Sequence, residues 1–234
     1  MNKQLTLAIQ PHHRTALQDF CWGGNIFLKQ QLAQILDNTG ERLIYIWGNN
    51  GCGKTHVLQG VCQTYSEQSQ PATSIYIPLE ILRTCSPTSL DDLAEQPLIA
   101  IDDLDSIAGM PDWEEALLHL YNQVRDHSNG ILIMSNTVPP NNSLIRLADL
   151  RSRFGWGLVV HLKELHDENK ILVLQQQARR RGFELTITVA EFLINHCARN
   201  MHALHDILEQ LDAESLVAQR KITIPFVKSV LNTP

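Results

Sequence analysis

The chain has 234 residues with a formal net charge of −6, and 44% of its residues are hydrophobic. This length can bury one substantial core and holds at most two domains. The acidic balance argues against a protein held on DNA by its own phosphate contacts, because such proteins usually carry a basic surface. We therefore expect a nucleotide or other proteins as partners, with any basic patch confined to one region.

The cysteines and the apolar segments indicate where the protein works. The five cysteines are scattered without a C-x-x-C pair, which is typical of reduced thiols in a cytosolic protein. No apolar run approaches the ~20 residues that a membrane span needs. The N-terminus also lacks the architecture of a signal peptide. We therefore expect a cytoplasmic protein that makes no membrane contact.

Apolar periodicity divides the first part of the chain into strands and helices. In chain order, the predicted elements are a helix over 28–36, a strand over 43–47, a helix over 56–65, strands over 75–77 and 98–101, a helix over 113–124, and strands over 131–135 and 158–160. Apolar strands that alternate with helices are typical of an α/β fold whose parallel sheet is covered by helices on both faces.

After residue 163 the pattern predicts helices alone. The first predicted helix covers 167–181, with Gly182 as its stop, and the second begins at a capping box that starts at Thr188. The third runs from an N-cap at Asn200 to near Arg220, and the fourth runs from a cap at Thr223 through Val230. The sequence thus predicts a tail at 1–11, an α/β nucleotide-binding domain at 12–163, and a small helical domain at 164–234.

The turn after the first predicted strand carries a complete phosphate-binding motif. Residues 48–55 read Gly-Asn-Asn-Gly-Cys-Gly-Lys-Thr and match G-x-x-x-x-G-K-[ST], between a strand and a helix as the motif requires. Backbone N–H groups of such a loop close around phosphate oxygens, and the helix N-terminus adds its positive end. Lys54 would reach the β- and γ-phosphates, and Thr55 would hold Mg²⁺. The alternative is a glycine-rich turn that binds nothing.

The predicted cofactors are therefore ADP or ATP with Mg²⁺. The candidate contacts within the motif are Gly48, Gly51, Cys52, Gly53, Lys54, Thr55 and His56.

Two further strands end in polar residues that suit nucleotide hydrolysis. The apolar strand over 98–101 ends in Asp102 and Asp103, about fifty residues after the phosphate-binding motif, which is the Walker-B pattern. We expect Asp102 to reach Mg²⁺ through water and Asp103 to orient or activate the attacking water. Asn136 closes the next strand and would face the γ-phosphate. The alternative for the two aspartates is a strand-to-loop turn with solvated side chains, and the alternative for Asn136 is a helix cap or turn residue.

Longer stretches resemble a known family. Residues 51–58 are similar to the P-loop of DnaA, and Leu-Arg-Ser-Arg-Phe-Gly-Trp-Gly-Leu at 150–158 resembles the DnaA segment around its inter-subunit arginine. Residues 180–185 and 219–228 resemble the Hda family, the regulatory relatives of DnaA within the AAA+ class. The resemblance covers nearly the whole chain. It implies a P-loop AAA+ domain followed by an all-helical lid, and no helix-turn-helix follows before Pro234.

The resemblance also implies a function. Hda-type proteins, bound to nucleotide and docked on the DNA-loaded sliding clamp, promote hydrolysis of ATP on DnaA and so inhibit repeated initiation of replication. The implied partners are DnaA, the β subunit that forms the clamp, and DNA reached through the clamp, and a homo-oligomer is compatible with the family. Arg153 is the expected arginine finger, with Arg151 in reserve and a surface salt bridge as the alternative. Intrinsic ATPase activity is expected to be weak.

A short N-terminal segment is similar to the clamp-binding motif Gln-Leu-x-Leu-x-Leu. It contributes Gln4, Leu5, Leu7 and Ile9 as candidate clamp contacts. The alternative is a peripheral strand of the α/β domain.

The lid departs from the family pattern. His202 stands where the family has its sensor-2 arginine, and Arg199 lies three residues before it. A neutral histidine anchors a γ-phosphate poorly compared with a permanent guanidinium, which favours ADP. For the adenine, the family uses the segment before the first helix, so that Phe20, Trp22 and Asn25 become candidates. A core role is the alternative for the aromatic residues.

Two other classes of function remain as alternatives to the regulator. Complete Walker motifs also suit an autonomous ATPase of the helicase-loader type. A direct DNA-binding regulator is disfavoured by the acidic charge.

Overall fold

The structure contains the five strands that the sequence predicts. The computed structural model describes residues 17–68, 74–126, 130–218 and 220–231. The strands are β1 (Leu43–Trp47), β2 (Ser74–Pro78), β3 (Leu98–Asp102), β4 (Ile131–Asn136) and β5 (Leu158–His161). They form one parallel sheet in the order β2-β3-β4-β1-β5. Because all five strands run the same way, their carboxyl ends share one edge of the sheet.

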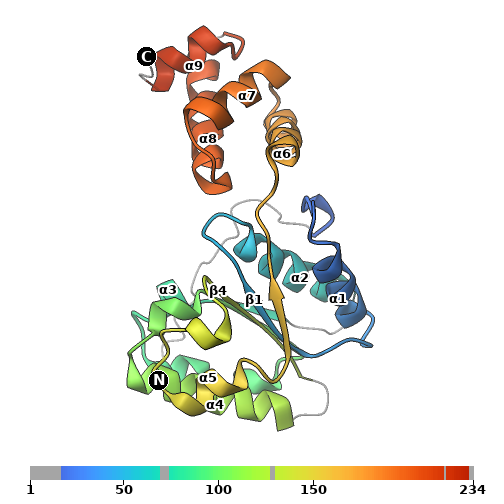
Figure 1. Cartoon of the computed structure of the whole chain (residues 1–234), viewed down its shortest axis with the longest axis vertical. Helices are drawn as coiled ribbons and strands as arrows, with labels where there is room; N and C mark the ends of the chain where they lie inside the picture. The colour runs from blue at the N-terminus through green and yellow to red at the C-terminus, as the bar shows by residue number, and fades with distance from the viewer. Residues whose placement is uncertain (1–16, 69–73, 127–129, 219, 232–234) are drawn as a thin grey trace, which may run out of the picture.

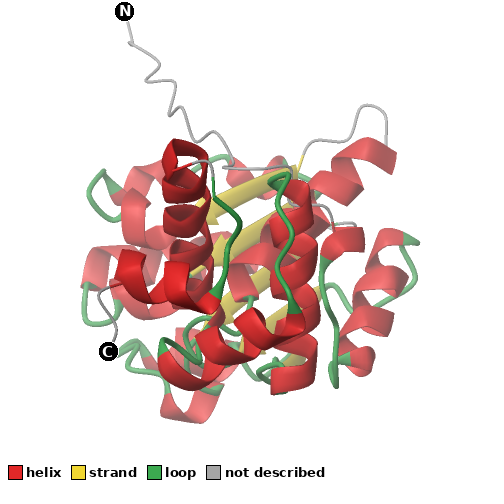
Figure 2. Cartoon of the chain, turned by 90° about the horizontal axis from the view of Figure 1, so that it is seen from above, coloured by secondary structure: helices red, strands yellow, loops and turns green. Residues whose placement is uncertain are grey.

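Helices cover both faces of this sheet, which confirms the predicted α/β class (Figures 1 and 2). Helices α1 (Ile26–Leu36) and α2 (Lys54–Gln68) pack on one face, where Ile44 and Ile46 of β1 are buried. The other face carries α3 (Leu79–Leu82), α4 (Pro111–Asp126) and α5 (Ala148–Arg153). Tyr45 of β1 is buried on that side. Alternate residues of β1 therefore belong to two different cores, as the pleat of a strand demands.

Four helices follow the sheet and form a separate group, which we call the lid. They are α6 (Asp167–Arg180), α7 (Ile187–His196), α8 (Met201–Ala218) and α9 (Ile224–Leu231). Their buried apolar side chains form a core of their own. Figure 1 shows the chain rising from β5 into α6, so that the lid stands over one end of the α/β part.

The predicted starts of the lid helices are confirmed in two cases and wrong in one. Asn200 caps α8, since its Oδ1 accepts from the Ala203 N–H at 2.8 Å, and Thr223 caps α9 through the Phe226 N–H at 3.4 Å. The cap of α7 is Thr186, not Thr188. The Thr186 backbone is extended and its hydroxyl accepts from the Val189 N–H, so the helix already begins at Ile187.

The five cysteines are free thiols, as expected. Among the described residues, no helix is long and apolar enough to cross a membrane.

Candidate functional site: a phosphate-binding cavity between sheet and lid

A cavity of about 1230 Å³ lies where the carboxyl edge of the sheet meets the lid. Its walls come from the P-loop and the start of α2, from α3, from the turns after β3 and β4, and from the lid helices α6 and α8. A second hollow, of about 360 Å³, is lined by residues of α6 alone, shares Gln176 and Arg180 with the first, and includes no residue of the P-loop. The chemistry that the sequence predicts therefore gathers at the larger cavity.

The P-loop is folded as a cradle. Gly51 and Gly53 have φ values of +79° and +104°, which residues with a Cβ rarely adopt. A Cβ on Gly53 would lie 2.7 Å from the ring of Phe20. Lys54 is buried, and its Nζ donates to the carbonyl oxygens of Gly48 at 2.8 Å and Asn49 at 3.2 Å. The lysine is thus held inside the loop, at the start of a helix whose N–H groups open toward the cavity.

The remaining motif residues divide between the cavity and its support. Cys52, Thr55 and His56 line the cavity, and Thr55 is exposed at its wall. Gly48 does not line it, because it packs against the chain that leads to the lid. A Cβ there would lie 2.4 Å from the Leu162 carbonyl oxygen. Gly48 therefore permits close approach of the P-loop and the lid connection and does not itself face a ligand.

The two Walker-B carboxylates occupy different environments. Asp102 is only 1% exposed, and its oxygens accept from the hydroxyl of Tyr76 at 2.8 Å and from the hydroxyl of Ser135. Asp103 lines the cavity and has a left-handed backbone with φ +59°. Asp102 therefore lies behind the wall, fixed by two hydroxyl groups, while Asp103 faces the cavity.

Burial raises the pKa of Asp103 from its ordinary value to about 6, and the nearby charge of Asp102 adds to the shift. Lys54 opposes it. A carboxyl group with such a pKa can accept a proton near neutral pH.

Asn136 does not reach the cavity. It is fully buried, its Nδ2 donates to the Tyr45 hydroxyl at 2.7 Å, and its Oδ1 accepts from the Thr137 N–H at 2.7 Å. Thr137 lines the cavity in its place, with its N–H and hydroxyl both bonded to Asp105. The side chain that faces the cavity therefore comes one residue after the predicted one, because the Asn136 side chain at the end of β4 points into the core beneath the sheet.

The segment before α1 contributes one of its predicted adenine contacts to the cavity. Phe20 lines it, with ring centroids 4.6 Å from Trp22 and 5.3 Å from His56. Asn25 does not line the cavity and instead binds the backbone of the segment between β5 and α6. Its side chain donates to the Lys163 carbonyl at 2.9 Å and accepts from the Lys163 N–H at 2.8 Å. Trp22 does not line the cavity. The apolar wall therefore comes from Phe20, with Trp22 behind it.

The first turn of α8 stands over the P-loop. A Cβ on Gly51 would lie 3.5 Å from the backbone nitrogens of Met201 and His202. The His202 side chain lines the cavity but is 82% exposed, and its ion pair with Asp206 is long at 3.8 Å. Arg199 does not line the cavity and lies 3.8 Å from Asp167. Neither residue is fixed in the structure as a sensor-2 arginine would be.

The candidate finger, Arg153, lies away from this cavity. It is the last residue of α5, its guanidinium donates to Asn122 Oδ1, and it stands 5.0 Å from the centroid of the Trp156 ring. Trp156 is 58% exposed and carries Arg125 at 5.5 Å as well. Arg151, on the same helix, is exposed and donates to the Ile145 carbonyl at 3.2 Å.

Sequence reasoning missed several residues that line the cavity. The lid provides Gln177, Arg180, Arg181 and His205, and the turn after β3 provides Asp105. Arg180 and Arg181 lie in the stretch that resembles the Hda family, but no motif marks any of these positions as a ligand contact. They approach the P-loop only because α6 and α8 fold back over it.

A parallel five-stranded sheet with a P-loop after β1, a Walker-B aspartate after β3 and a helical lid over both defines a P-loop protein of the AAA+ class. Within that class the family can be given. The chain belongs to the family of bacterial DnaA ATPase domains, whose model matches residues 13–161, and the model of the Hda lid domain matches residues 167–231.

Individual relatives agree with this assignment. An uncharacterized protein of Haemophilus influenzae is 40% identical over 99% of this chain and 100% of that protein. Among solved structures, domain III of the replication initiation protein DnaA from Thermotoga maritima is similar, with a TM-score of 0.80 at 22% identity over 93% of this chain and 95% of that one. AMPPCP-bound DnaA from Aquifex aeolicus has a TM-score of 0.72 at 20% identity, over 90% of this chain and 68% of that one. These two structures share the fold.

Proposed function

We propose that this protein binds an adenine nucleotide with Mg²⁺ and, in that state, promotes hydrolysis of ATP on DnaA, so that it inhibits repeated initiation of replication. The observation that carries the proposal is the place of Arg153. This arginine lies outside the chain's own cavity, beside an exposed tryptophan, in a chain whose two parts match DnaA-type and Hda-type models.

Nucleotide binding is supported by the cradle. Lys54 and the N–H groups from Gly51 to Thr55 would hold the phosphates, and Phe20 would cover the base. Thr55, with Asp102 through water, would hold Mg²⁺, which would neutralise phosphate charge. The glycine conformations at 51 and 53 leave the space that close approach of phosphate to backbone requires.

Action on a neighbouring subunit is supported by the position of α5. Figure 1 places α5 on the side of the molecule away from the lid, so Arg153 cannot serve the chain's own nucleotide. A guanidinium delivered across a subunit boundary stabilises charge that develops in phosphoryl transfer, and can be worth ~10³–10⁵ in rate. Trp156 and Arg125 beside it are residue types that dominate protein interfaces.

The experiment follows hydrolysis of DnaA-bound ATP in the presence of this protein and DNA-loaded clamp. Wild type should accelerate the reaction. Arg153→Ala should return it to the rate of DnaA alone, because the lost cation acts only in the transition state. Arg151→Ala is the matched control on the same helix and should keep the acceleration. If both variants accelerate hydrolysis as wild type does, the proposal is wrong; loss in Arg151→Ala alone moves the finger to that residue.

The same preparation separates the regulator from an autonomous ATPase of the helicase-loader type. Asp103 in the cavity is the observation that keeps that second function open. We propose weak turnover and a preference for ADP, since the exposed His202 provides no fixed cation for a γ-phosphate. Robust ATP turnover without DnaA would favour the autonomous enzyme.

A further inference from the structure

The lid brings arginine side chains to the wall of the nucleotide cavity. Apart from histidines, the cationic side chains that α6 brings to this cavity are Arg180 and the residue after its last turn, Arg181. The charge of Arg180 is already paired, because this residue forms an ion pair with Asp19 of the α/β part. Among the residues that the structure describes, no carboxylate lies within ion-pair distance of Arg181. Its positive charge is therefore available to an anion in the cavity.

Hydrogen bonds fix the direction of Arg181. Its guanidinium lies 3.2 Å from Nε2 of His205 and donates to the Gln177 carbonyl at 3.4 Å. A guanidinium can only donate, so Nε2 of His205 accepts. The proton of the neutral ring is then on Nδ1, which donates to Gln177 Oε1 at 3.0 Å. The lid thus positions Arg181 with two partners that carry no charge.

The same contacts place Arg181 near the P-loop. Met201 of α8 lies over Gly51, and His205 lies one helical turn further along the same face. Arg181 contacts that histidine from α6. A half-buried guanidinium with neutral supports, beside a cradle of backbone N–H groups, is the arrangement that binds phosphate.

We propose that Arg181 contacts the phosphates of a bound nucleoside di- or triphosphate and supplies from α6 the lid cation that His202 does not supply from α8. The inference rests on the proposed nucleotide binding. It makes His205 and Gln177 positioning residues. Closure of the lid over a nucleotide is then stabilised by a charge-assisted contact that ADP can already satisfy.

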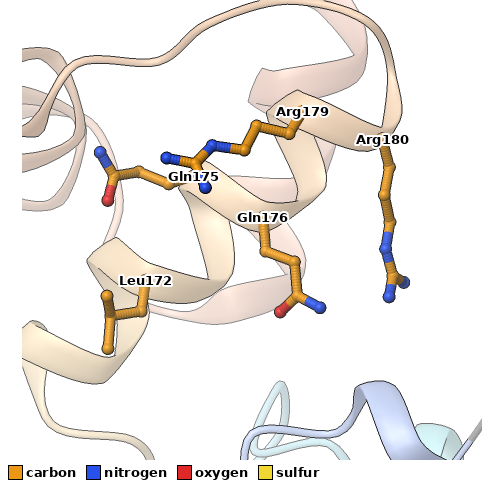
Figure 3. A pocket seen from close by; sticks show the side chains of 5 residues that line it. All are labelled: Leu172, Gln175, Gln176, Arg179 and Arg180. Atoms are coloured by element: carbon orange, nitrogen blue, oxygen red, sulfur yellow. The ribbon is translucent and has the colours of Figure 1, made fainter.

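The test is calorimetric titration of the full chain with ADP. Arg181→Gln should raise the dissociation constant about 10-fold, the value of one hydrogen bond to a charged group, and should flatten its dependence on salt concentration. Arg181→Lys keeps the positive charge but loses the paired N–H donors of the planar guanidinium, so a dissociation constant between those of wild type and Arg181→Gln is expected. Arg179→Gln is the matched control. Arg179 is exposed, does not line the nucleotide cavity, and leaves the helix in a different direction from Arg180 (Figure 3), so this variant should bind as wild type does.

Competition by adenosine distinguishes a phosphate contact from a structural role. Adenosine has no phosphates, so Arg181→Gln should leave its affinity unchanged. Wild-type ADP affinity in Arg181→Gln, or equal losses for ADP and adenosine, would overturn the inference. Failure of the proposed nucleotide binding would give a different result. If Lys54→Ala keeps the wild-type affinity for ADP, the P-loop is not the phosphate-binding site, whatever the effect of Arg181→Gln.

Discussion

At the scale of single residues, the site separates groups that face the cavity from groups that hold them. Asp102 and Asn136 are buried and bonded to hydroxyl groups of the sheet, while Asp103 and Thr137, each one position further on, face the cavity. The buried member of each pair fixes the turn that presents its neighbour. Burial beside another carboxylate then raises the pKa of Asp103.

The raised pKa of Asp103 predicts that Asp103→Asn changes the stability of the protein in a pH-dependent way. The folded-state pKa of about 6 lies above the ordinary value of 3.8. The folded protein therefore binds the extra proton between these values, and stability falls as pH rises through the window. Removing the charge should raise the melting temperature at pH 7.5, and this gain should shrink as the pH approaches 4.

The matched control for that variant is Asp92→Asn. Asp92 also has a left-handed backbone, with φ +64°, but it is exposed. Asparagine tolerates this conformation well, so both variants share a gain that does not depend on pH. Thermal melts from pH 4 to 8 should show a pH-dependent difference for Asp103→Asn alone. Parallel curves for the two variants would contradict the assigned burial of Asp103.

At the scale of elements, the start of α7 provides a direct test of the structure against the sequence pattern. Thr186→Ala should lower the free energy of unfolding by ~1 kcal/mol, the usual loss of a threonine N-cap. Thr188→Ala should change it little, because Thr188 lies in the exposed first turn. Urea unfolding of both variants measures the difference. A larger loss for Thr188→Ala would restore the cap that the capping-box pattern indicates.

The strands were predictable because their signal is local. Continuous apolar runs such as 98–101 are the pattern of a parallel sheet buried on both faces, and their carboxyl ends place the Walker residues at one edge. Short helices such as α3 and α5 escaped prediction, since four to six residues carry too little periodicity. The cap of α7 failed because two threonines stand two residues apart, and only the backbone conformation decides between them.

The candidate site was predictable only where a motif carries it. The P-loop and Asp103 follow from strand, turn and helix in sequence order. Asn25 and Asn136 have the right residue types, but tertiary contacts to Lys163 and Tyr45 turn them away. Arg181 lies in a stretch that resembles the Hda family, but no motif marks it as a ligand contact, because its role depends on two helices that meet only in the folded lid.

At the scale of the whole molecule, the cavity exists only while the lid is held over the sheet. The contacts that hold it there include the ion pair of Arg180 with Asp19, the paired hydrogen bonds of Asn25 with Lys163, and the close approach of Gly48 to Leu162. Nucleotide binding would add a further contact through Arg181. Arg153 does not line this cavity, so in the proposed function the nucleotide and DnaA would contact different parts of the chain, and a further segment would be needed for recruitment to the clamp.

The N-terminal peptide is the segment that we expect to provide this recruitment, although its residues lie outside the described part of the structure. Gln4 offers an amide to a small polar pocket, and Leu7 and Ile9 each contribute ~1.5–3 kcal/mol if fully enclosed by the clamp. The conformational entropy that the peptide loses when it binds would offset part of this, so a modest affinity is expected. Changing Gln4 and Leu5 to alanine should abolish co-elution with the sliding clamp and leave ADP binding intact.

A matched control and a concentration series make this prediction sharper. Thr6→Ala changes a position that the clamp motif leaves open, and it should retain clamp binding. Because recruitment acts through effective concentration, the Gln4 and Leu5 double variant should regain acceleration of DnaA-bound ATP hydrolysis when it is added in large excess. Arg153→Ala should not regain it at any concentration, since it lacks the transition-state contact. A protein without residues 1–10 that still co-elutes with the clamp would show that another surface makes the contact.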